Sequence, residues 1–253
     1  MSTRDLPLPD LAPYAAEQIR FAVAAWPMRA AEELRSAGIF RALAEASRVA
    51  GVPPPWPARF AAAVRDEVRH ARLCVHVGAR LGASAPVYDS KPVRARLARL
   101  PDPLLRTAAL LLVEVAIGET ISMYMFRAGR RGAVEPLTRA ALGAILRDEV
   151  RHQKIGWTGL VSLWPMLTEA LRAEVQREAA RGLAACEQQT ARPAMRWLQK
   201  REPFDPAYAA LGVLHPEARV EAFYDAVERL VIPRLTRVGL DGPNAWKNRY
   251  RQV

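Results

Sequence analysis

The sequence predicts an all-α protein. Three observations predict this class: Ala, Leu and Arg dominate the 253 residues, 51% of the residues are hydrophobic, and strand-like alternation is scarce. Segments of helical periodicity are separated by proline, glycine and short polar clusters, which commonly end helices. A chain of this length can bury a substantial core. We therefore expect one helical bundle rather than a disordered chain.

Helical periodicity divides the first part of the chain into four long helical segments. The first covers about Leu11–Val49, and Pro27 within it predicts a break or a new helix start. A rigid proline-rich turn then occupies residues 51–57. The other three helices are expected at about Ala58–Leu81, Leu104–Arg130 and Glu135–Leu163. A looser crossover over Gly82–Pro103, with a short helix over Val93–Leu100, joins the second helix to the third.

The chain after the fourth helix is expected to be peripheral. It contains a helical segment over Leu167–Leu198, a loop over Lys200–His215, a last helix over Pro216–Val238 and an irregular tail after Asp241. Pro216 at a helix start and Gly239 just past its end follow the usual asymmetry of helix ends. We therefore divide the chain into a helical bundle, residues 1–165, and a C-terminal helical extension packed on it, residues 166–253.

One pentapeptide, Asp-Glu-Val-Arg-His, occurs twice, at Asp66–His70 and at Asp148–His152. Within each copy, Glu and His are three residues apart, so one helix face presents a carboxylate and an imidazole together. The repeat is a strong signal because the chain has only four histidines, and we interpret the other two, His76 and His215, as structural. Each motif helix follows a helix without a motif, which predicts two related αα hairpins.

Each motif lies on the helix stripe that is expected to be buried. The small and apolar neighbours on these stripes are Phe60, Ala63, Cys74 and Val77 in the second helix, and Leu142, Ile145, Gly156 and Gly159 in the fourth. A buried, unpaired carboxylate is costly, so converging glutamates and histidines require a compensating charge. Carboxylate oxygen with imidazole nitrogen suits Fe(II) or Mn(II) and leaves open positions for oxygen. Outward-pointing glutamates paired with arginines are the alternative, which two matched motifs disfavour.

A centre with two metal ions needs two further carboxylates, one from the first helix and one from the third. In the first helix Glu32 and Glu33 compete, and periodicity only leans to Glu33. In the third helix Glu119 aligns with apolar residues, whereas Glu114 lies nearly opposite on an ideal helix. Glu67 follows Glu33 by 34 residues, and Glu149 follows Glu119 by 30 residues. Both hairpins therefore place their carboxylates at similar depth.

Four charged residues within the motifs are candidates for a supporting role. Metal-bound histidines usually donate their second nitrogen to a carboxylate. Asp66 would orient the histidine of the second motif, and Asp148 would orient the histidine of the first. Arg69 and Arg151 would neutralise these aspartates. Ordinary surface charge is the competing explanation for each of the four.

The motifs resemble those of non-haem diiron carboxylate proteins of the ferritin-like superfamily, related to the diiron oxygenases and the ribonucleotide reductase small subunit. The surrounding sequence looks still more like small bacterial ferritin-like domain proteins. The matching stretches are Glu33–Phe40, Asp66–Cys74, Gly118–Thr120 and Asp148–Trp157. The resemblance implies a ferritin-like four-helix bundle with additional C-terminal helices. It also implies six metal ligands, namely Glu33, Glu67, His70, Glu119, Glu149 and His152.

The resemblance also discriminates between functions. A ferritin-type oxidation centre generally lacks the second Glu-x-x-His histidine, which disfavours iron storage. Arylamine N-oxygenases have an additional histidine ligand four residues before the last-helix glutamate, and this position is Ile145 here. That type of N-oxygenation is therefore disfavoured as well.

The net charge of +11 comes almost entirely from arginine. Because no dense basic block appears, nucleic acid is an unlikely partner. Two cysteines are too few for a disulfide framework. Residues 1–7 contain no apolar signal region, and the most apolar stretch, Thr107–Ile117, is too short to span a bilayer. We expect a cytoplasmic protein without a membrane partner.

The first functional hypothesis is an oxidoreductase. Two Fe ions (Fe2+/Fe3+), or an Mn/Fe pair, would activate O2 to oxidise a small organic substrate, with an electron-donor protein as a further partner and a homodimer as one assembly. Five small residues beside the motifs either leave room for the substrate or allow close helix packing: Ala37, Ala63, Cys74, Gly156 and Gly159. The alternatives are a ferroxidase or peroxide-scavenging metal-handling protein, and a tRNA-modifying diiron hydroxylase.

Overall fold

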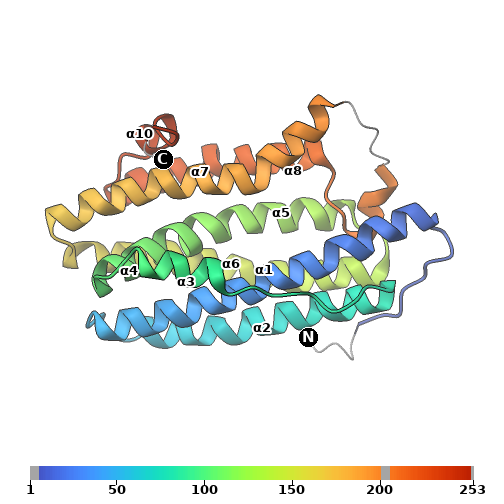
Figure 1. Cartoon of the computed structure of the whole chain (residues 1–253), viewed down its shortest axis with the longest axis horizontal. Helices are drawn as coiled ribbons and strands as arrows, with labels where there is room; N and C mark the ends of the chain where they lie inside the picture. Colours follow the sequence, from blue (N-terminus) through green and yellow to red (C-terminus); the bar gives the residue numbers. More distant parts are fainter. Residues whose placement is uncertain (1–5, 201–205, 252–253) are drawn as a thin grey trace.

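Four long helical rods form a bundle along the long axis of the molecule (Figure 1). The computed structural model describes residues 6–200 and 206–251, and no strand occurs among them. The rods are α1 (Ala16–Val49), α2 (Trp56–Leu81), α4 (Pro103–Leu110) continuing into α5 (Glu119–Gly132), and α6 (Pro136–Leu163). α1 packs along α2, α5 packs along α6, and α2 also contacts α6. The prediction of an all-α, ferritin-like bundle is confirmed.

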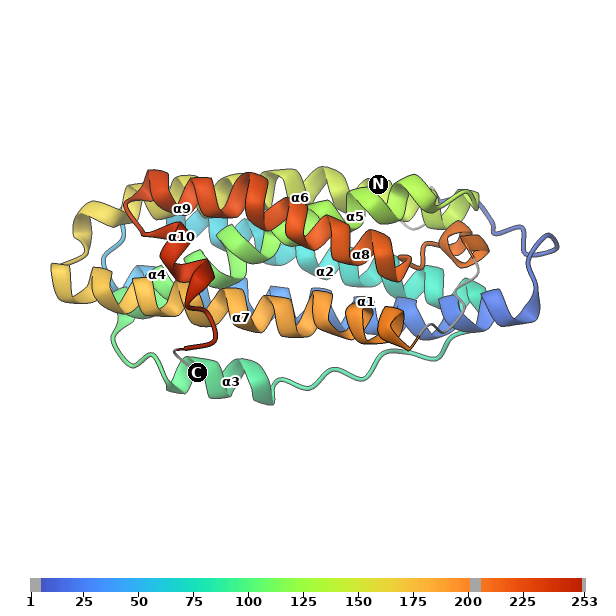
Figure 2. The same cartoon turned by 90° about the horizontal axis from the view of Figure 1, so that it is seen from above.

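The connection between the two halves of the bundle is a long crossover. It leaves α2 at Gly82, whose φ of 98° gives the left-handed conformation that ends a helix. The chain then runs along the outside of the bundle and contains the short helix α3 (Lys91–Ala98) before α4 begins (Figure 2). The crossover allows the second hairpin to lie beside the first with its motif helix facing α2.

The C-terminal helices cover one side of the bundle (Figure 2). They are α7 (Glu169–Gln199), α8 (Pro216–Ala226), α9 (Ile232–Val238) and α10 (Gly242–Lys247), with the π-helical segment η5 (Val227–Val231) joining α8 to α9. Short 3-10 turns, η3 (Trp164–Met166) and η4 (Pro206–Leu211), precede α7 and α8. α7 contacts α4 and α8, and α8 contacts α5. The division of the chain at residue 165 stays a prediction.

The C-terminal tail is partly helical. The tail after Asp241 was expected to be irregular, but it contains α10, which Asp241 caps by accepting a hydrogen bond from the backbone N–H of Asn244 at 3.0 Å. Part of the loop predicted over Lys200–His215, and most of the N-terminal stretch used to judge a signal region, lie outside the described residues.

Pro27 lies inside the continuous helix α1, so both expectations for this position, a break and a new helix start, are wrong. A proline inside a helix removes one backbone hydrogen bond and costs about 3 kcal/mol or more. Packing around the position offsets this cost, because the neighbouring Trp26 and Ala30 are completely buried. The indole N–H of Trp26 also donates a hydrogen bond to the carbonyl of Leu211 at 3.1 Å. Tertiary contacts therefore override the local preference for a break.

The third rod is not a uniform α-helix. Its middle is the π-helical segment η2 (Leu111–Gly118), which inserts extra backbone just before Glu119. The whole helix Pro103–Gly132 is long and apolar enough to cross a membrane by length and composition, and 61% of its most apolar window is buried inside the bundle. The core helix of a bundle has the same properties. The sequence-based estimate, which considered only Thr107–Ile117, missed this length.

Two apolar clusters fill the bundle, with a polar layer between them. On α1, Trp26 and Ala30 belong to one cluster and Phe40 and Leu43 to the other. On α2 and α6 the motif residues likewise separate residues of one cluster from residues of the other. Glu33 therefore lies on α1 between two dry regions that exclude water along the bundle axis.

Candidate metal centre

The polar layer consists of six buried residues from all four rods. α1 carries Glu33, α2 carries Glu67 and His70, α5 begins at Glu119, and α6 carries Glu149 and His152. Each of the six residues is at most 5% exposed to solvent. The structure therefore brings together all six residues proposed from the sequence as metal ligands; their role as ligands stays a prediction.

The six residues form two overlapping groups. The ligand atoms of Glu33, Glu67, His70 and Glu149 lie within 4.8 Å of one another, and so do those of Glu67, Glu119, Glu149 and His152. Glu67 and Glu149 belong to both groups. Each group also has a glutamate and a histidine of its own. Such an arrangement would suit two cations that share two carboxylates.

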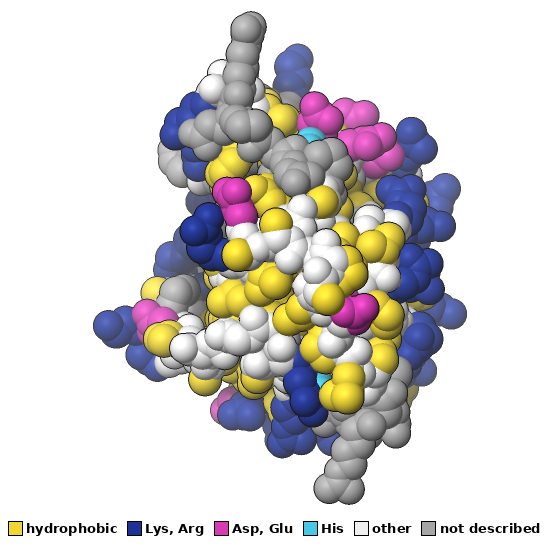
Figure 3. All heavy atoms as spheres, turned by 90° about the vertical axis from the view of Figure 1, so that its right-hand side faces the viewer, with side chains coloured by type: hydrophobic (Ala, Val, Ile, Leu, Met, Phe, Trp, Pro, Cys, Tyr) yellow, Lys and Arg dark blue, Asp and Glu magenta, His cyan; other side chains and the backbone are white. Residues whose placement is uncertain are grey.

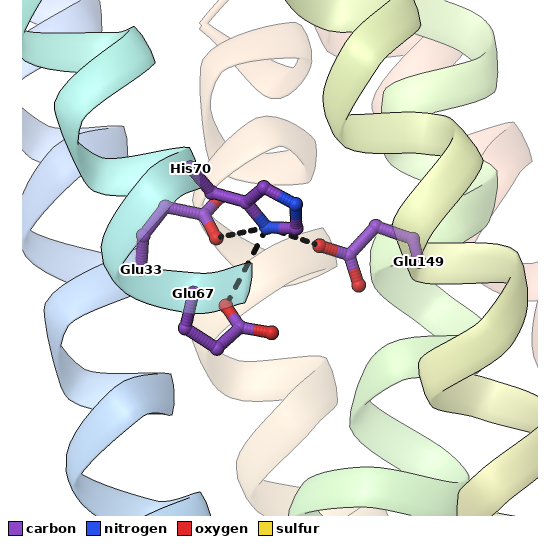
Figure 4. Close-up of side chains that lie close together, drawn as sticks. All are labelled: Glu33, Glu67, His70 and Glu149. Carbon is purple, nitrogen blue, oxygen red and sulfur yellow. Dashed lines mark ion pairs between the residues drawn. The ribbon is translucent and has the colours of Figure 1, made fainter. Parts of the chain in front are cut away.

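Both histidines direct Nδ1 into the centre. His70 Nδ1 lies 3.4 Å from Glu33 and 3.3 Å from Glu149, and Figure 4 shows the carboxylates converging on this nitrogen. His152 Nδ1 lies 2.8 Å from Glu67 and 3.6 Å from Glu149. The two imidazole rings are 5.8 Å apart between centroids. The inward nitrogens are therefore placed to act as ligand atoms, one in each group.

The outer nitrogen of each histidine faces an aspartate of the opposite motif. His70 Nε2 lies 3.1 Å from Asp148, and His152 Nε2 lies 3.3 Å from Asp66. Because an ionised carboxylate only accepts hydrogen bonds, each Nε2–H donates. This leaves the lone pair of Nδ1 free for a cation. The cross-pairing is the one expected from the sequence.

Two arginines form ion pairs with these two aspartates on the outer side of the centre. Arg69 donates to Asp66 at 2.8 Å and also to Asp148. Arg151 lies 3.0 Å from Asp66 and 2.8 Å from Asp148. Although burial alone would raise them, hydrogen bonds from the histidines and arginines hold the pKa values of both aspartates well below the usual range. Both aspartates therefore stay ionised and hold the histidines in one orientation.

Without a cation, the buried carboxylates and histidines compete for protons. Burial raises the pKa values of Glu33 and Glu119 well above the usual range, and neighbouring carboxylates raise them further. Burial opposes a charged imidazole at His152, but contacts with Asp66, Glu149 and Glu67 outweigh it and raise the pKa of His152 to about 12. The pKa of His70 is raised for the same reason. In the metal-free protein, protons bound to these glutamates and histidines thus compensate the negative charge of the centre.

The residues fit a pair of divalent cations. Four buried polar atoms in the centre make no hydrogen bond of acceptable geometry with the described residues, although His152 Nδ1 and Glu67 Oε1 lie only 2.8 Å apart; the four atoms are Oε1 of Glu67, Nδ1 of His70, Oε2 of Glu149 and Nδ1 of His152. Buried polar atoms are rarely left without partners. Four ionised glutamates and two neutral histidines carry the charge that two divalent cations cancel. The donor set of oxygen and imidazole nitrogen suits Fe(II) or Mn(II).

The competing glutamates lie elsewhere. Glu114 forms ion pairs of 2.8 Å with Arg35 and with Arg96, on the side of the third rod that faces the peripheral helices. Glu32 is exposed. The two remaining histidines are outside the centre; His215 caps α8 by accepting a hydrogen bond from the backbone of Glu217. These positions agree with the choices made from periodicity.

Small residues beside the motifs do not provide room for a substrate. A Cβ atom on Gly156 would lie 2.6 Å from the backbone nitrogen of Ala116, and one on Gly159 would lie 3.1 Å from Leu111. These glycines therefore allow α6 to pack closely against η2 and against the side chain of Leu111. Ala37, Ala63 and Cys74 are buried in the core and do not line the cavity beside the centre. For the two glycines, the interpretation as close helix packing is confirmed.

A cavity of about 210 Å³ reaches the centre from the side of the C-terminal helices. Glu33, Glu119 and Glu149 line its inner wall. Gln189 and Thr190 of α7 and Arg219 of α8 line its outer wall. Sequence reasoning assigned no role to these three outer residues, because no motif marks them and they approach the centre only through tertiary packing.

Comparison with known proteins identifies a solved structure that has a similar fold. No protein-family model matches the chain, and no curated protein matches it. Among solved structures, the chain is similar to a protein from Synechococcus described as "Protein 19 with aldehyde deformylating oxidase activity", with a TM-score of 0.61 and 19% identity. The match covers 94% of this chain and 98% of that chain, so the shared fold includes helices after residue 165.

Proposed function

We propose that this chain is a non-haem diiron oxidase or oxygenase that oxidises a small organic substrate with O2. The observation that carries the proposal is the pair of buried residue groups that share Glu67 and Glu149. Each group also contains one further glutamate and one histidine. A structural neighbour whose described activity is that of an oxidase supports it at the level of fold. Iron is the proposed metal, and an Mn/Fe pair has the same ligand preferences.

When bound, two iron ions would supply the redox chemistry that activates O2, which protein side chains cannot provide. Glu33, Glu67 and His70 would hold one ion together with Glu149. Glu119 and His152 would complete the site of the other with the same two shared carboxylates. These residues come from four packed rods, so the two sites are held at a constant separation by the bundle itself.

The remaining residues control access and protons. The apolar clusters on both sides exclude water along the bundle axis, which protects a reactive centre from side reactions. Asp66 and Asp148 hold Nε2–H of the histidines, so that Nδ1 stays directed inward. The cavity leaves one side of the centre, next to Glu33 and Glu119, open to O2 and substrate. An electron-donor protein is a further proposed partner.

Two alternative functions, a metal-handling protein and a tRNA-modifying hydroxylase, predict different experimental results. A ferroxidase or peroxide scavenger would turn over without an organic substrate, and a storage protein would take up many irons per chain. A tRNA-modifying hydroxylase would need a basic surface. On the face in Figure 3, most Lys and Arg side chains lie at the periphery, and the middle is mainly uncharged with a few Asp or Glu side chains. This face therefore presents no basic patch.

The proposal is tested by anaerobic reconstitution with Fe(II), followed by metal analysis and rapid mixing with O2. We expect about two irons per chain and consumption of O2 that accelerates when the correct organic compound is added. The variant Glu119→Gln should take up less iron, whereas Glu114→Gln is the matched control on the same rod and should load normally. A wild-type chain that binds no transition metal would reject the proposal.

A further inference from the structure

The cavity beside the centre has an unusual charge distribution on its outer side. Three arginines line it, Arg29 and Arg35 from α1 and Arg219 from α8, and the exposed Glu32 of α1 lines it as well. Arg35 is paired, because its guanidinium lies 2.8 Å from the carboxylate of Glu114. Arg29 and Arg219 form no ion pair with any residue that the structure describes. Two arginines without an ion pair among the described residues thus line the same small space, where Glu32 is the one lining carboxylate besides the candidate ligands Glu33, Glu119 and Glu149.

Arg29 is held in place without being neutralised. Its Nη2 donates to the carbonyl of Gly212 at 3.2 Å, and its guanidinium stacks over the ring of Trp26 at 4.6 Å from the centroid. Its Nη1 is buried and has no hydrogen-bond partner among the described residues. A rigid guanidinium with an unused buried donor is suited to bind an oxygen atom of a ligand.

Arg219 of α8 lines the same cavity as Arg29. Burial lowers the pKa of the Arg219 guanidinium, and the positive charge of Arg29 lowers it further, while the exposed Glu32 acts weakly in the other direction. Both guanidiniums line the same cavity, so each lies in the positive field of the other. Such a pair is costly unless an anion joins it. The glutamates on the inner wall do not serve this purpose in the proposed function, because the metal ions would use their charge.

We propose that the substrate is a small organic acid whose carboxylate binds between Arg29 and Arg219, with its oxidisable carbon directed toward Glu33 and Glu119. The inference rests on the proposed function, since it assigns a substrate class to the same centre. Arginine forks bind carboxylates in a bidentate manner. Arg29 precedes Glu33 by one helical turn, about 6 Å along the axis, so a few carbon atoms span the distance.

The rest of the cavity agrees with a short substrate that has both polar and apolar parts, because Ile121, Met125, Phe126 and Leu214 line it together with uncharged polar residues. Ser122 of α5 and Gln189 and Thr190 of α7 contribute uncharged polar groups to the wall. A volume of about 210 Å³ holds a small molecule rather than a long alkyl chain. The proposal also assigns a task to α7 and α8: they complete the wall that selects the substrate and they carry one of the two anion-binding arginines.

The first test measures binding rather than turnover. The full chain is loaded with Mn(II) and titrated with sodium hexanoate, and with hexanol as a neutral analogue, by calorimetry. We expect Arg219→Gln and Arg29→Gln each to weaken hexanoate binding about 10-fold or more, because each removes a charge-assisted contact. Hexanol binding should be unaffected. The control Arg72→Gln removes an exposed arginine of α2 and should bind hexanoate like the wild type. Equal hexanoate affinity in all three variants would overturn the proposal.

The second test measures orientation. Mn(II) accelerates the relaxation of nearby protons, so NMR reports which end of hexanoate is closer to the centre. We expect the methyl end to relax faster than the protons next to the carboxylate. The reverse order would mean that the carboxylate binds the metal instead of the arginines and would overturn the proposal. Should Arg219→Gln fail to fold, Arg219→Lys keeps the charge but loses the fork and should bind hexanoate with intermediate affinity; wild-type affinity would overturn it.

The two proposals fail in different ways. A chain that takes up two Mn(II) ions but does not bind hexanoate overturns the substrate assignment and leaves the proposed function standing. A chain that takes up no metal overturns the proposed function itself.

Discussion

The carboxylate of Asp148 on α6 lies 3.1 Å from Nε2 of His70 on α2. The two residues come from the two copies of one pentapeptide, and the reciprocal contact joins Asp66 to His152 at 3.3 Å. Each motif thus supplies a candidate ligand and also the group that orients the histidine of the other motif. The duplication explains why Asp and Arg recur beside Glu and His.

The variant Asp66→Ala should retain the fold and lose metal affinity. Removing the partner of Nε2 frees the ring of His152 and lowers the basicity of Nδ1, which typically costs 10–100-fold in affinity. Mn(II) titration with circular dichroism measures both properties. Asp225→Ala is a matched control, because it removes a surface aspartate that pairs with Arg229 on α8 and η5. Wild-type metal affinity in Asp66→Ala would reject the orienting role.

Substitution of Glu119 should affect metal binding, whereas substitution of Glu114 on the same rod should affect only the free energy of unfolding. Glu119→Gln should reduce metal uptake from two ions per chain to about one, because only one of the two residue groups includes Glu119. Glu114→Gln should leave uptake unchanged. It should lower the free energy of unfolding by about 1–3 kcal/mol, because it weakens ion pairs with Arg35 and Arg96. Metal analysis and urea unfolding check the pair. Identical stoichiometry in both variants would contradict the assignment.

Gly156→Ala should destabilise the protein by about 1–3 kcal/mol, because the added methyl overpacks the contact with the backbone of Ala116. The control is Gly129→Ala on α5, where the nearest atom, on Leu142, would be 3.8 Å from the new Cβ. That change should be neutral or stabilise by up to about 1 kcal/mol through helix propensity. Thermal unfolding distinguishes them, at about 2–4 °C per kcal/mol for a chain of this size. A neutral Gly156→Ala would show that α6 can move away from η2.

The metal-free protein should lose stability as the pH rises from about 6.5 to 9. The pKa values of His70 and His152 are raised in the fold, so the stability that they contribute is complete below the unfolded value of about 6.5 and is lost above it. The raised pKa values of Glu33 and Glu119 act in the same direction. The lowered pKa of Asp66 contributes stability that is already complete above about pH 4.

Urea unfolding in the presence of EDTA measures this dependence. Each proton held only in the folded state corresponds to about 1.4 kcal/mol per pH unit. Added Mn(II) should stabilise the protein more at pH 9 than at pH 6.5, because cations compete with these protons. A metal-free stability that is constant or increases over this range would contradict the charge state inferred for the centre.

The sequence alone determined the helical class and the composition of the polar centre. A period of 3.6 residues places Glu67 and His70 on one stripe, and a three-residue spacing is local information that any helix converts into proximity. The repeat of the motif then supplied the symmetry between the two hairpins. The choice of Glu119 over Glu114 followed from the apolar character of its stripe.

Tertiary structure alone decided three other matters. Pro27 lies inside a continuous helix because burial of Trp26 offsets a lost hydrogen bond, a balance that local sequence does not contain. The glycines of α6 became packing contacts because η2 lies directly against them. Arg29 and Arg219 line one cavity although they are far apart in the chain, because α8 packs against α5 and α7 beside the centre. Periodicity orients a side chain on its own helix; only packing chooses its neighbour.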